Sequence, residues 1–320
     1  MPDDYILCFL RGILYVMAAQ TVKNFKTLAG ALAGLYGRNV RIARTDRLPS
    51  GGTNKVYGLY LTDGTHIFMK ANTRENAGFF AAEVVCLEAI ASTEKVGTPK
   101  ILCTGTDPGE QSGYSFLLLE YIEPCCPVDS YWKTFGHELA ELHKSDCSGF
   151  VRGGKYGFIA DNYIGAAEQI NNARSSWVDF YRDCRLIPQF RKASHYFTST
   201  TQAKITKLLD RLDSYIVEPG RPSLLHGDLW SGNVLCGPDC RACLIDPACY
   251  CGCNEADIAM TQLFGGFPEE FYKAYDEVNK LQPGYNYRRD MYNLYHLLNH
   301  LNLFGETYLE PVYSIINEYV

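Results

Sequence analysis

The sequence has no long uninterrupted hydrophobic run and no cluster of basic residues. A membrane-spanning helix needs about twenty consecutive apolar residues, and no segment of this chain provides them. The apolar stretch near the N-terminus follows Asp3 and Asp4 and is interrupted by Arg11, whereas a signal peptide carries positive charge before its apolar run. The formal net charge of −6, without a basic run, argues against a nucleic-acid-binding surface. We therefore expect neither a membrane nor a nucleic acid as a partner.

The chain also lacks internal repeats and low-complexity tracts. Its 320 residues are 47% hydrophobic and 21% charged, which are ordinary values for a folded protein. This length suffices for two domains that bury their own cores. We expect residues 1–19 to be an N-terminal extension without a defined role in the fold, because Met17 precedes a helix-like stretch and is an alternative start.

Cysteine, in contrast, is abundant, with 13 residues. A chain of this size does not need a disulfide framework, and the apolar neighbours of residues such as Cys86 suit buried reduced thiols. We therefore expect a cytoplasmic protein. Several cysteines crowd into residues 236–253, where Cys240 and Cys243 have the spacing of zinc ligands. Because this stretch flanks Asp246 on both sides, we favour apolar fillers or exposed thiols over a structural zinc.

Two acidic residues and an asparagine form the pattern that organises the chain. Asp228 and Asn233 stand five positions apart, and Asp246 follows thirteen positions later. In protein-kinase-type phosphotransferases an Asp orients the acceptor hydroxyl, an Asn five residues on holds Mg²⁺, and a second Asp holds the metals that bridge the phosphates. We predict Asp228 as the catalytic base and the other two as metal ligands. Gly227 and Pro247 stand where protein kinases have Arg and Phe, which favours a small-molecule substrate.

A lysine at the end of a predicted strand is the second part of this pattern. Lys70 ends the apolar run 66–70, and Glu83 lies thirteen residues on, within the predicted helix 78–90. A strand Lys that reaches the α- and β-phosphates of ATP and is held by a helix Glu is a kinase feature. Glu88 on the same helix is the competing partner, but it lies one and a half turns further on.

A glycine pair precedes the hairpin predicted over residues 57–70. Gly51 and Gly52 would let backbone N–H groups approach phosphate oxygens, so we predict that both contribute to nucleotide binding. By itself, a Gly-Gly pair before a strand is more often an ordinary turn.

The predicted strand 114–122 ends where a kinase hinge would pass beside adenine. We expect Glu120 and Ile122 to contribute main-chain contacts to the nucleotide there. We place the domain boundary at the same point, with an N-lobe over 20–122 and a C-lobe over 123–320. The predicted fold class is α+β, a bilobal protein-kinase-like fold with a small antiparallel-sheet N-lobe and a mainly helical C-lobe.

Helical periodicity is found over residues 20–35, 132–143, 177–191 and 201–217. His137 and His143 are six residues apart in the second of these helices, which places them on different faces, so we expect solvated or capping histidines rather than metal ligands.

Residues 153–171 are rich in glycine, amides and aromatics and are predicted to form a loop. Such a composition suits hydrogen bonding to a polyhydroxyl ligand, and equally an ordered surface loop. Asn162 and Gln169 are the candidate substrate contacts. Asp257, at the start of a predicted helix, could bond the backbone of the catalytic loop or could be only an N-terminal acid that the helix dipole favours. We assign His226 and Asp257 to the support of the site.

Several motifs together resemble the fructosamine kinase family, also called ketosamine-3-kinases, within the aminoglycoside phosphotransferase and choline kinase group. The resemblance covers about 46–304. The motifs are His226-Gly-Asp-Leu-Trp-Ser-Gly-Asn233, Leu244-Ile-Asp-Pro-Ala-Cys-Tyr250, Glu255-Ala-Asp-Ile-Ala-Met260, Leu263-Phe-Gly-Gly-Phe267, Leu294-Tyr-His-Leu-Leu-Asn-His-Leu-Asn-Leu-Phe304, and Asn162-Tyr-Ile-Gly165 with Gln169 and Asn171.

This resemblance implies ATP- and Mg²⁺-dependent phosphorylation of the sugar 3-hydroxyl of ketosamines. The acceptor would be a fructosamine or ribulosamine, either as a small molecule or on a glycated protein lysine, and loss of the unstable 3-phosphate would restore the amine. Trp230 would then lie beside the sugar. Thr53 stands where some members place a cysteine in the glycine-rich loop, so a redox switch through that loop is not supported.

Three other functions stay open at this point. A kinase of another hydroxylated amine, such as an aminoglycoside or choline, would share the catalytic pattern. A nucleotide-binding protein without catalysis would have no need of the acidic residues Asp228 and Asp246. A zinc-dependent scaffold would use the cysteine cluster.

Overall fold

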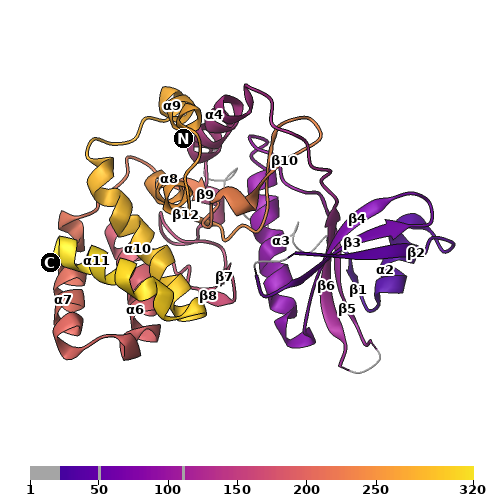
Figure 1. Cartoon of the computed structure of the whole chain (residues 1–320), viewed down its shortest axis with the longest axis horizontal. Coiled ribbons are helices and arrows are strands. Elements are labelled where there is room, and N and C mark those ends of the chain that lie inside the picture. Colours follow the sequence, from indigo (N-terminus) through magenta and orange to yellow (C-terminus); the bar gives the residue numbers. More distant parts are fainter. Residues whose placement is uncertain (1–21, 50–51, 110–111) are drawn as a thin grey trace. The chain divides into compact units, whose positions relative to one another are not determined.

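The computed structural model describes residues 22–49, 52–109 and 112–320 (Figure 1). The expected N-terminal extension 1–19 therefore lies outside the described residues. The chain divides into two compact units, one containing residues up to Tyr131 together with Leu235–Asp246, and the other containing Trp132–Val234 and Pro247–Val320. The predicted domain boundary assigned 123–131 and 235–246 to the second domain, whereas here they group with the first unit.

The first unit is built on a six-stranded sheet with the strand order β1-β5-β6-β4-β3-β2. All neighbouring strands are antiparallel except β1 and β5, which are parallel, so the prediction of an antiparallel sheet misses this one pair. The strands are β1 (Asn24–Phe25), β2 (Ile42–Leu48), β3 (Lys55–Leu61), β4 (His66–Asn72), β5 (Ile101–Asp107) and β6 (Tyr114–Glu120).

Two helices pack against this sheet. Successive side chains of a strand point to opposite faces, and those of β6 accordingly divide between two cores. Phe116 and Leu118 pack in a cluster with residues of α2 (Leu28–Tyr36), and Leu117 and Leu119 pack in a second cluster with residues of α3 (Ala77–Ala91). Figure 1 shows α3 as a long helix beside the strands.

The first helix is shorter than predicted. Helical periodicity predicted a helix over 20–35, but 24–25 form strand β1, and α2 begins only at Leu28. Thr27 precedes it with an extended backbone, and its hydroxyl accepts a hydrogen bond from the N–H of Gly30 at 3.0 Å. A threonine in this position is a strong helix start signal, and the prediction overlooked it.

A small hairpin completes the first unit. Strands β10 (Val234–Cys236) and β11 (Ala242–Leu244) pair with each other, and the N–H of Leu244 donates to the carbonyl of Gly97 at 2.8 Å. The hairpin leads directly to Asp246, so this residue is carried by the first unit.

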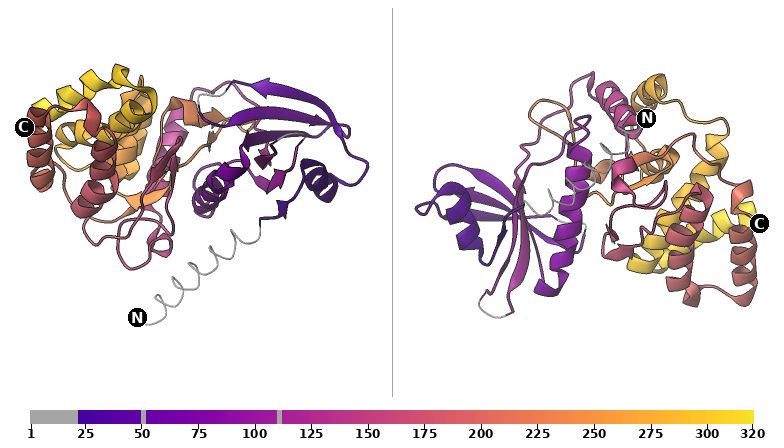
Figure 2. Two further views of the ribbon diagram at one scale, coloured as in Figure 1. Left: turned by 90° about the horizontal axis from the view of Figure 1, so that it is seen from below. Right: turned by 180° about the vertical axis from the view of Figure 1, so that it is seen from behind.

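The second unit is mainly helical, and its C-terminal helices, coloured orange to yellow, gather together in both views of Figure 2. The predicted helix over 132–143 is present as α4. The helix predicted over 177–191 is interrupted by a π-helical turn at Arg182–Leu186, and the loop predicted over 153–171 contains a two-stranded sheet. The elements are α4 (Tyr131–Lys144), β7 (Asn162–Ile164), β8 (Ala167–Gln169), α5 (Trp177–Tyr181), α6 (Ile187–Lys192), α7 (Ser199–Asp210), β9 (Ser223–Leu225), β12 (Tyr250–Gly252), α8 (Asn254–Leu263), α9 (Glu269–Val278), α10 (Tyr285–Phe304) and α11 (Leu309–Tyr319).

Within the described ranges, none of these helices combines the length and the apolar character that a membrane crossing requires.

Candidate active site

Lys70 is the centre of a buried charge cluster in the first unit. Its side chain lies on β4 between β3 and β6 and is only 3% exposed. The ammonium group donates to Glu83 of α3 at 2.5 Å and also contacts the carboxylate of Asp246. Glu88, the alternative partner in the sequence, is not part of this cluster as the structure describes it. The strand, the helix and the hairpin therefore bring one cation and two carboxylates together.

This cluster keeps Lys70 charged. Burial by itself would lower the pKa of Lys70, but the carboxylates of Asp246 and Glu83 outweigh burial and raise it above its ordinary value. Asp246 has a left-handed backbone with φ of 56° and a side chain that is 48% exposed. Positive φ is uncommon outside glycine and often marks functional positions. The cluster thus holds a permanent positive charge beside a carboxylate that solvent and ligands can reach.

The glycine-rich bend between β2 and β3 lines a hollow of about 360 Å³. Arg47 and Lys55 contribute positive charge to its lining, and Gly52 has open space where a side chain would point. Gly51 lies outside the described residues. A polar hollow with two cations and open space beside a glycine is suited to oxygen-rich anions such as phosphates.

The predicted hinge follows β6. The N–H of Glu120 donates to the carbonyl of Lys100 at 2.8 Å, and the Glu120 carboxylate accepts from the N–H of Lys100 at 3.2 Å. These groups therefore hold the end of β6 to the residue that precedes β5. Ile122, two residues after Glu120, lies beside Gly237 of the β10–β11 hairpin.

Asp228 and Asn233 are held together in the second unit. The side-chain amide of Asn233 donates to the backbone carbonyl of Asp228 at 2.8 Å and to its carboxylate at 3.1 Å. Because both bonds use the amide nitrogen, the amide oxygen lies on the other side of the group. Asp228 is half-buried, whereas Asn233 is 6% exposed. The pair thus presents an oriented carboxylate and an oxygen ligand of the hard type that Mg²⁺ prefers.

Gly227 allows the chain to turn into this loop. Its φ is +82°, and a Cβ atom here would lie 2.1 Å from the carbonyl oxygen of Ala248. In addition, the N–H of Ala248 donates to the carbonyl of His226 at 2.8 Å. A glycine is therefore required by both conformation and space, and the residues before Asp228 are fixed against those that follow Pro247.

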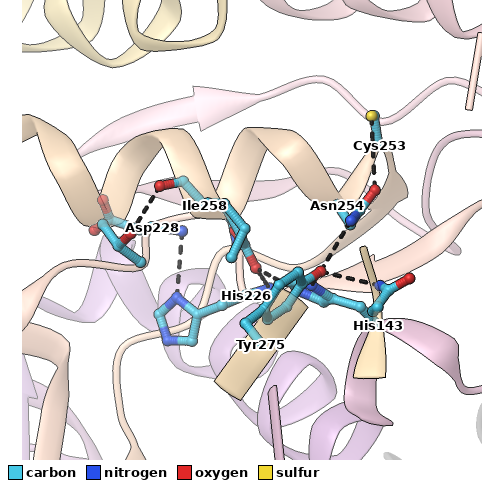
Figure 3. Close-up of polar contacts among 11 residues, drawn as sticks. His143, His226, Asp228, Cys253, Asn254, Ile258 and Tyr275 are labelled. Carbon is cyan, nitrogen blue, oxygen red and sulfur yellow. Dashed lines mark hydrogen bonds and ion pairs between the residues drawn. The ribbon is translucent and has the colours of Figure 1, made fainter. Parts of the chain in front are cut away.

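Asp257 holds the same loop from within the core. It is 1% exposed and accepts hydrogen bonds from the N–H groups of His226 at 2.7 Å and Gly227 at 2.9 Å. His143 approaches its carboxylate at 3.2 Å through Nε2, while Nδ1 lies 2.7 Å from the hydroxyl of Tyr275. Figure 3 shows His143 and Tyr275 pointing toward one another. Both ring nitrogens of His143 have a hydrogen-bond partner when Nε2 donates to the Asp257 carboxylate and Nδ1 accepts from the hydroxyl of Tyr275.

The expectation of a solvated or capping His143 is wrong, because this side chain is completely buried. It lies eight residues after Phe135 and four after Leu139, so the helical period that places those residues in the core places His143 there as well. His137, by contrast, is partly exposed and contacts Glu277.

Replacing Asp257 by Asn tests this support. Burial alone would raise the pKa of Asp257, but the hydrogen bonds from His143 and the loop N–H groups outweigh it and lower the pKa. A lowered pKa contributes stability above the unfolded value, about 3.9, and this contribution is lost as the pH falls below it. We expect Asp257→Asn to lower the free energy of unfolding by about 1.5–3 kcal/mol at pH 7, with the difference shrinking below about pH 4.

Urea unfolding at several pH values measures this difference, and the exposed Asp210→Asn is the matched control. Equal stabilities of wild type and Asp257→Asn at pH 7 would show that the carboxylate does not hold the loop.

Trp230 is 37% exposed and follows the catalytic loop Asp by two residues. Its ring lies directly over Gly232 and contacts Phe264 edge-on, with centroids 6.2 Å apart. Phe264 in turn contacts His300, with centroids 4.9 Å apart. An exposed aromatic face with this backing is available for stacking against a sugar ring.

Asn162 and Gln169 are not placed at an exposed surface. They are 3% and 1% exposed and hold backbone carbonyls, because Asn162 donates to Cys249 at 2.7 Å and Gln169 donates to Ala248 at 2.9 Å. Gln169 also donates to the Asn162 side chain at 2.7 Å and accepts from Tyr295 at 2.8 Å. The expected sugar contact does not fit this burial, and the two amides instead support the chain just after Pro247.

This amide network extends to a buried arginine. Arg185 is fully buried and donates to the side chain of Asn171 at 2.8 Å, while Asn171 donates to Asn162 at 3.0 Å. The guanidinium group stacks over Tyr250 at 3.9 Å. The sequence reasoning missed this arginine, because a single Arg between apolar residues gives no sign of its direction.

No group of three or more His, Cys, Asp or Glu side chains suited to a metal ion occurs in the described part of the chain. Cys249, Cys251 and Cys253 are buried.

Comparisons with known proteins agree with this arrangement. The profile of the fructosamine kinase family matches residues 24–320. A probable ketoamine kinase of Synechocystis sp. is 35% identical over 309 residues, which cover 94% of this chain and 99% of the relative. A chloroplastic protein-ribulosamine 3-kinase of Oryza sativa subsp. indica is 37% identical over 89% of this chain and 81% of the relative. A crystal structure from Haemophilus somnus, named as a fructosamine-3-kinase, has a TM-score of 0.79 and 29% identity and covers 92% of this chain and 97% of that chain. The predicted α+β, protein-kinase-like fold is confirmed.

Proposed function

Because the chain belongs to the fructosamine kinase family and is a kinase, we propose that it uses ATP and Mg²⁺ to phosphorylate the sugar 3-hydroxyl of ketosamines. The acceptor is a fructosamine or ribulosamine, either as a small molecule or on a glycated protein lysine. Loss of the 3-phosphate then restores the amine, so that the reaction leads to deglycation.

The observation that carries this proposal is the local geometry of Asp228. Asn233 fixes its carboxylate, and Asp257 fixes the loop that precedes it. A half-buried carboxylate held in this way can accept the proton of an acceptor hydroxyl and orient its oxygen for attack. Phosphoryl transfer needs mainly such positioning and charge stabilisation.

In this proposal the remaining residues bind the nucleotide. Lys70, held by Glu83, contacts the α- and β-phosphates, and backbone N–H groups of Gly51 and Gly52 are assigned to the phosphates as well. Glu120 and Ile122 lie in the hinge segment that passes adenine. Such a role uses a lysine that keeps its charge, as the raised pKa of Lys70 indicates.

The donor set fits Mg²⁺. Asn233 has its amide nitrogen engaged by Asp228, which leaves the amide oxygen as the ligand atom, and Asp246 has a partly exposed carboxylate. These two residues would hold the metal. When bound, Mg²⁺ neutralises the charge that develops on the transferred phosphoryl group.

Substrate recognition is assigned to Trp230, whose exposed ring can cover one face of the sugar. Asn162 and Gln169 act as positioning residues in this proposal and not as sugar contacts. His226 and Asp257 support the loop.

Identification of the product tests the proposed reaction. The full-length chain is incubated with ATP, Mg²⁺ and ribulosyl-lysine or fructosyl-lysine, and the position of the phosphate is determined by NMR. Phosphate on the sugar 3-hydroxyl, followed by appearance of free lysine, is the expected result. A stable phosphate on another hydroxyl would contradict the proposal.

The variant Gln169→Leu tests whether Gln169 positions the chain after Pro247 or contacts the sugar. The change removes the hydrogen bonds that Gln169 makes with Asn162, Ala248 and Tyr295, and this loss is expected to cost about 1–3 kcal/mol of stability. Without Gln169, the chain at Ala248 and the loop with Asp228 that it contacts are slightly displaced. Such a displacement lowers kcat by up to about 10²-fold, while KM for the ketosamine changes little.

Steady-state kinetics measures both constants, with Asn172→Ala, an exposed amide of the same stretch, as the control. An increase in KM at unchanged kcat would instead make Gln169 a sugar contact.

A further inference from the structure

The cysteines that solvent reaches are gathered in one place. Among the residues that the structure describes, Cys125, Cys126, Cys236 and Cys240 are partly or fully exposed. All four belong to the first unit, two in the segment after β6 and two in the β10–β11 hairpin. The remaining described cysteines are buried, and they are Cys86, Cys103, Cys147, Cys184, Cys243, Cys249, Cys251 and Cys253.

The backbone brings two of these thiols into contact. The N–H of Cys125 donates to the carbonyl of Cys236 at 2.9 Å, which ties the segment after β6 to the hairpin. The tight turn of the hairpin is closed by a bond from the N–H of Cys240 to Gly237 at 2.9 Å. As a result, the Sγ atoms of Cys125 and Cys240 are 3.1 Å apart. Two thiols at this separation need only a small movement to reach bonding distance, about 2.05 Å.

The contact between the two thiols affects the ionisation of Cys240. The contact with Cys125 raises the pKa of Cys240 to about 11. Because the thiolate is the attacking species, this contact disfavours a first attack by Cys240, and the scheme below assigns the first attack to Cys125. Once Cys125 has reacted, it no longer holds Cys240 in its protonated form.

We propose that Cys125 and Cys240 form a thiol modification site that small disulfides such as oxidised glutathione convert into a reversible intramolecular disulfide. The Cys125 thiolate attacks one sulfur of glutathione disulfide, forms a mixed disulfide and releases one glutathione thiolate. Cys240 then loses its proton, attacks Sγ of Cys125 and displaces the second glutathione. Two protein thiols are oxidised by two electrons, and glutathione disulfide is reduced to two molecules of glutathione.

The disulfide would tie the predicted hinge to the hairpin that leads to Asp246. This tether restrains 121–126, where the nucleotide is proposed to bind, so oxidation is expected to raise KM for ATP by about fivefold or more, a usual size for coupling between two sites. The effect on ATP rests on the proposed function, whereas the disulfide itself does not.

The test uses the full-length chain, reduced and then incubated with oxidised glutathione. We expect the chain to lose two titratable thiols and the mass of two hydrogen atoms, and we expect a proteolytic peptide pair linked through Cys125 and Cys240. Dithiothreitol should reverse all three changes. A glutathione adduct without the internal link, a link through Cys236, or a link between two chains would overturn the assignment.

Single serine variants provide the matched controls. Cys125→Ser and Cys240→Ser should each abolish the internal link, whereas Cys126→Ser, which removes the neighbouring exposed thiol, should leave it unchanged. An oxidised wild type that carries the link and has an unaltered KM for ATP would refute the effect of the disulfide on ATP binding, whereas the disulfide itself would be confirmed. A chain without kinase activity that still forms the link would contradict only the proposed function.

Discussion

Asp228→Asn is expected to lower the turnover of a ketosamine by about 10²–10⁴-fold, the usual contribution of a general base. The asparagine side chain has nearly the same shape as the aspartate, and so it should leave the fold intact. It cannot accept the proton of the sugar hydroxyl, however, and the acceptor is then no longer activated. ATP binding should survive, because the phosphate contacts are assigned to Lys70 and the glycine-rich bend.

Two measurements on this variant separate binding from chemistry. Single-turnover kinetics gives the loss of phosphoryl transfer, and calorimetric titration with a non-hydrolysable ATP analogue gives the affinity for the nucleotide. Asp213→Asn, an exposed residue of the same unit, is the control. Normal phosphorylation by Asp228→Asn would remove this residue from its proposed role.

Lys70→Met is expected to have the second large effect. It removes the only cation described in contact with Glu83 and Asp246 and leaves two carboxylates facing each other, one of them buried. Breaking a buried ion pair costs about 3–5 kcal/mol of stability, and loss of one group that stabilises the transition state costs about 10²–10³-fold in kcat. The variant should therefore unfold at lower urea concentration and transfer phosphate poorly.

Lys95→Met removes an exposed lysine of the same unit and is expected to change neither property. Lys70→Arg keeps the charge and should retain more stability than Lys70→Met. If Lys70→Met were as stable and as active as wild type, neither the charge cluster nor the proposed contact of Lys70 with the phosphates would be as described.

The contact between Lys70 and Glu83 could be predicted because its signals are local. A strand lysine and a helix glutamate at a fixed spacing leave few alternatives, and Glu83 lies one and a half turns closer than Glu88. The loop with Asp228 and Asn233 was predictable for the same reason, because five residues of one tight loop determine which side chains meet.

Other features depend on distant parts of the chain. In the sequence, Gln169 and Asn162 have the character of polar loop residues. Only the fold shows that they donate to the carbonyls of Ala248 and Cys249, which lie more than seventy positions away. The parallel pairing of β1 with β5 likewise joins segments far apart in sequence. His143 was different, because the helical period had already placed it on the buried face. The amphipathic pattern contained that information, and comparison with His137 alone obscured it.

The central claim is that the chain transfers phosphate from ATP to a ketosamine. It is tested most directly by ATP consumption with Mg²⁺ in the presence of fructosyl-lysine, ribulosyl-lysine, kanamycin or choline. We expect turnover with at least one of the two sugar-lysines, and loss of that turnover in Asp228→Asn. Activity with kanamycin or choline alone would contradict the substrate assignment, and ATP binding without turnover of any of the four would contradict the proposed reaction.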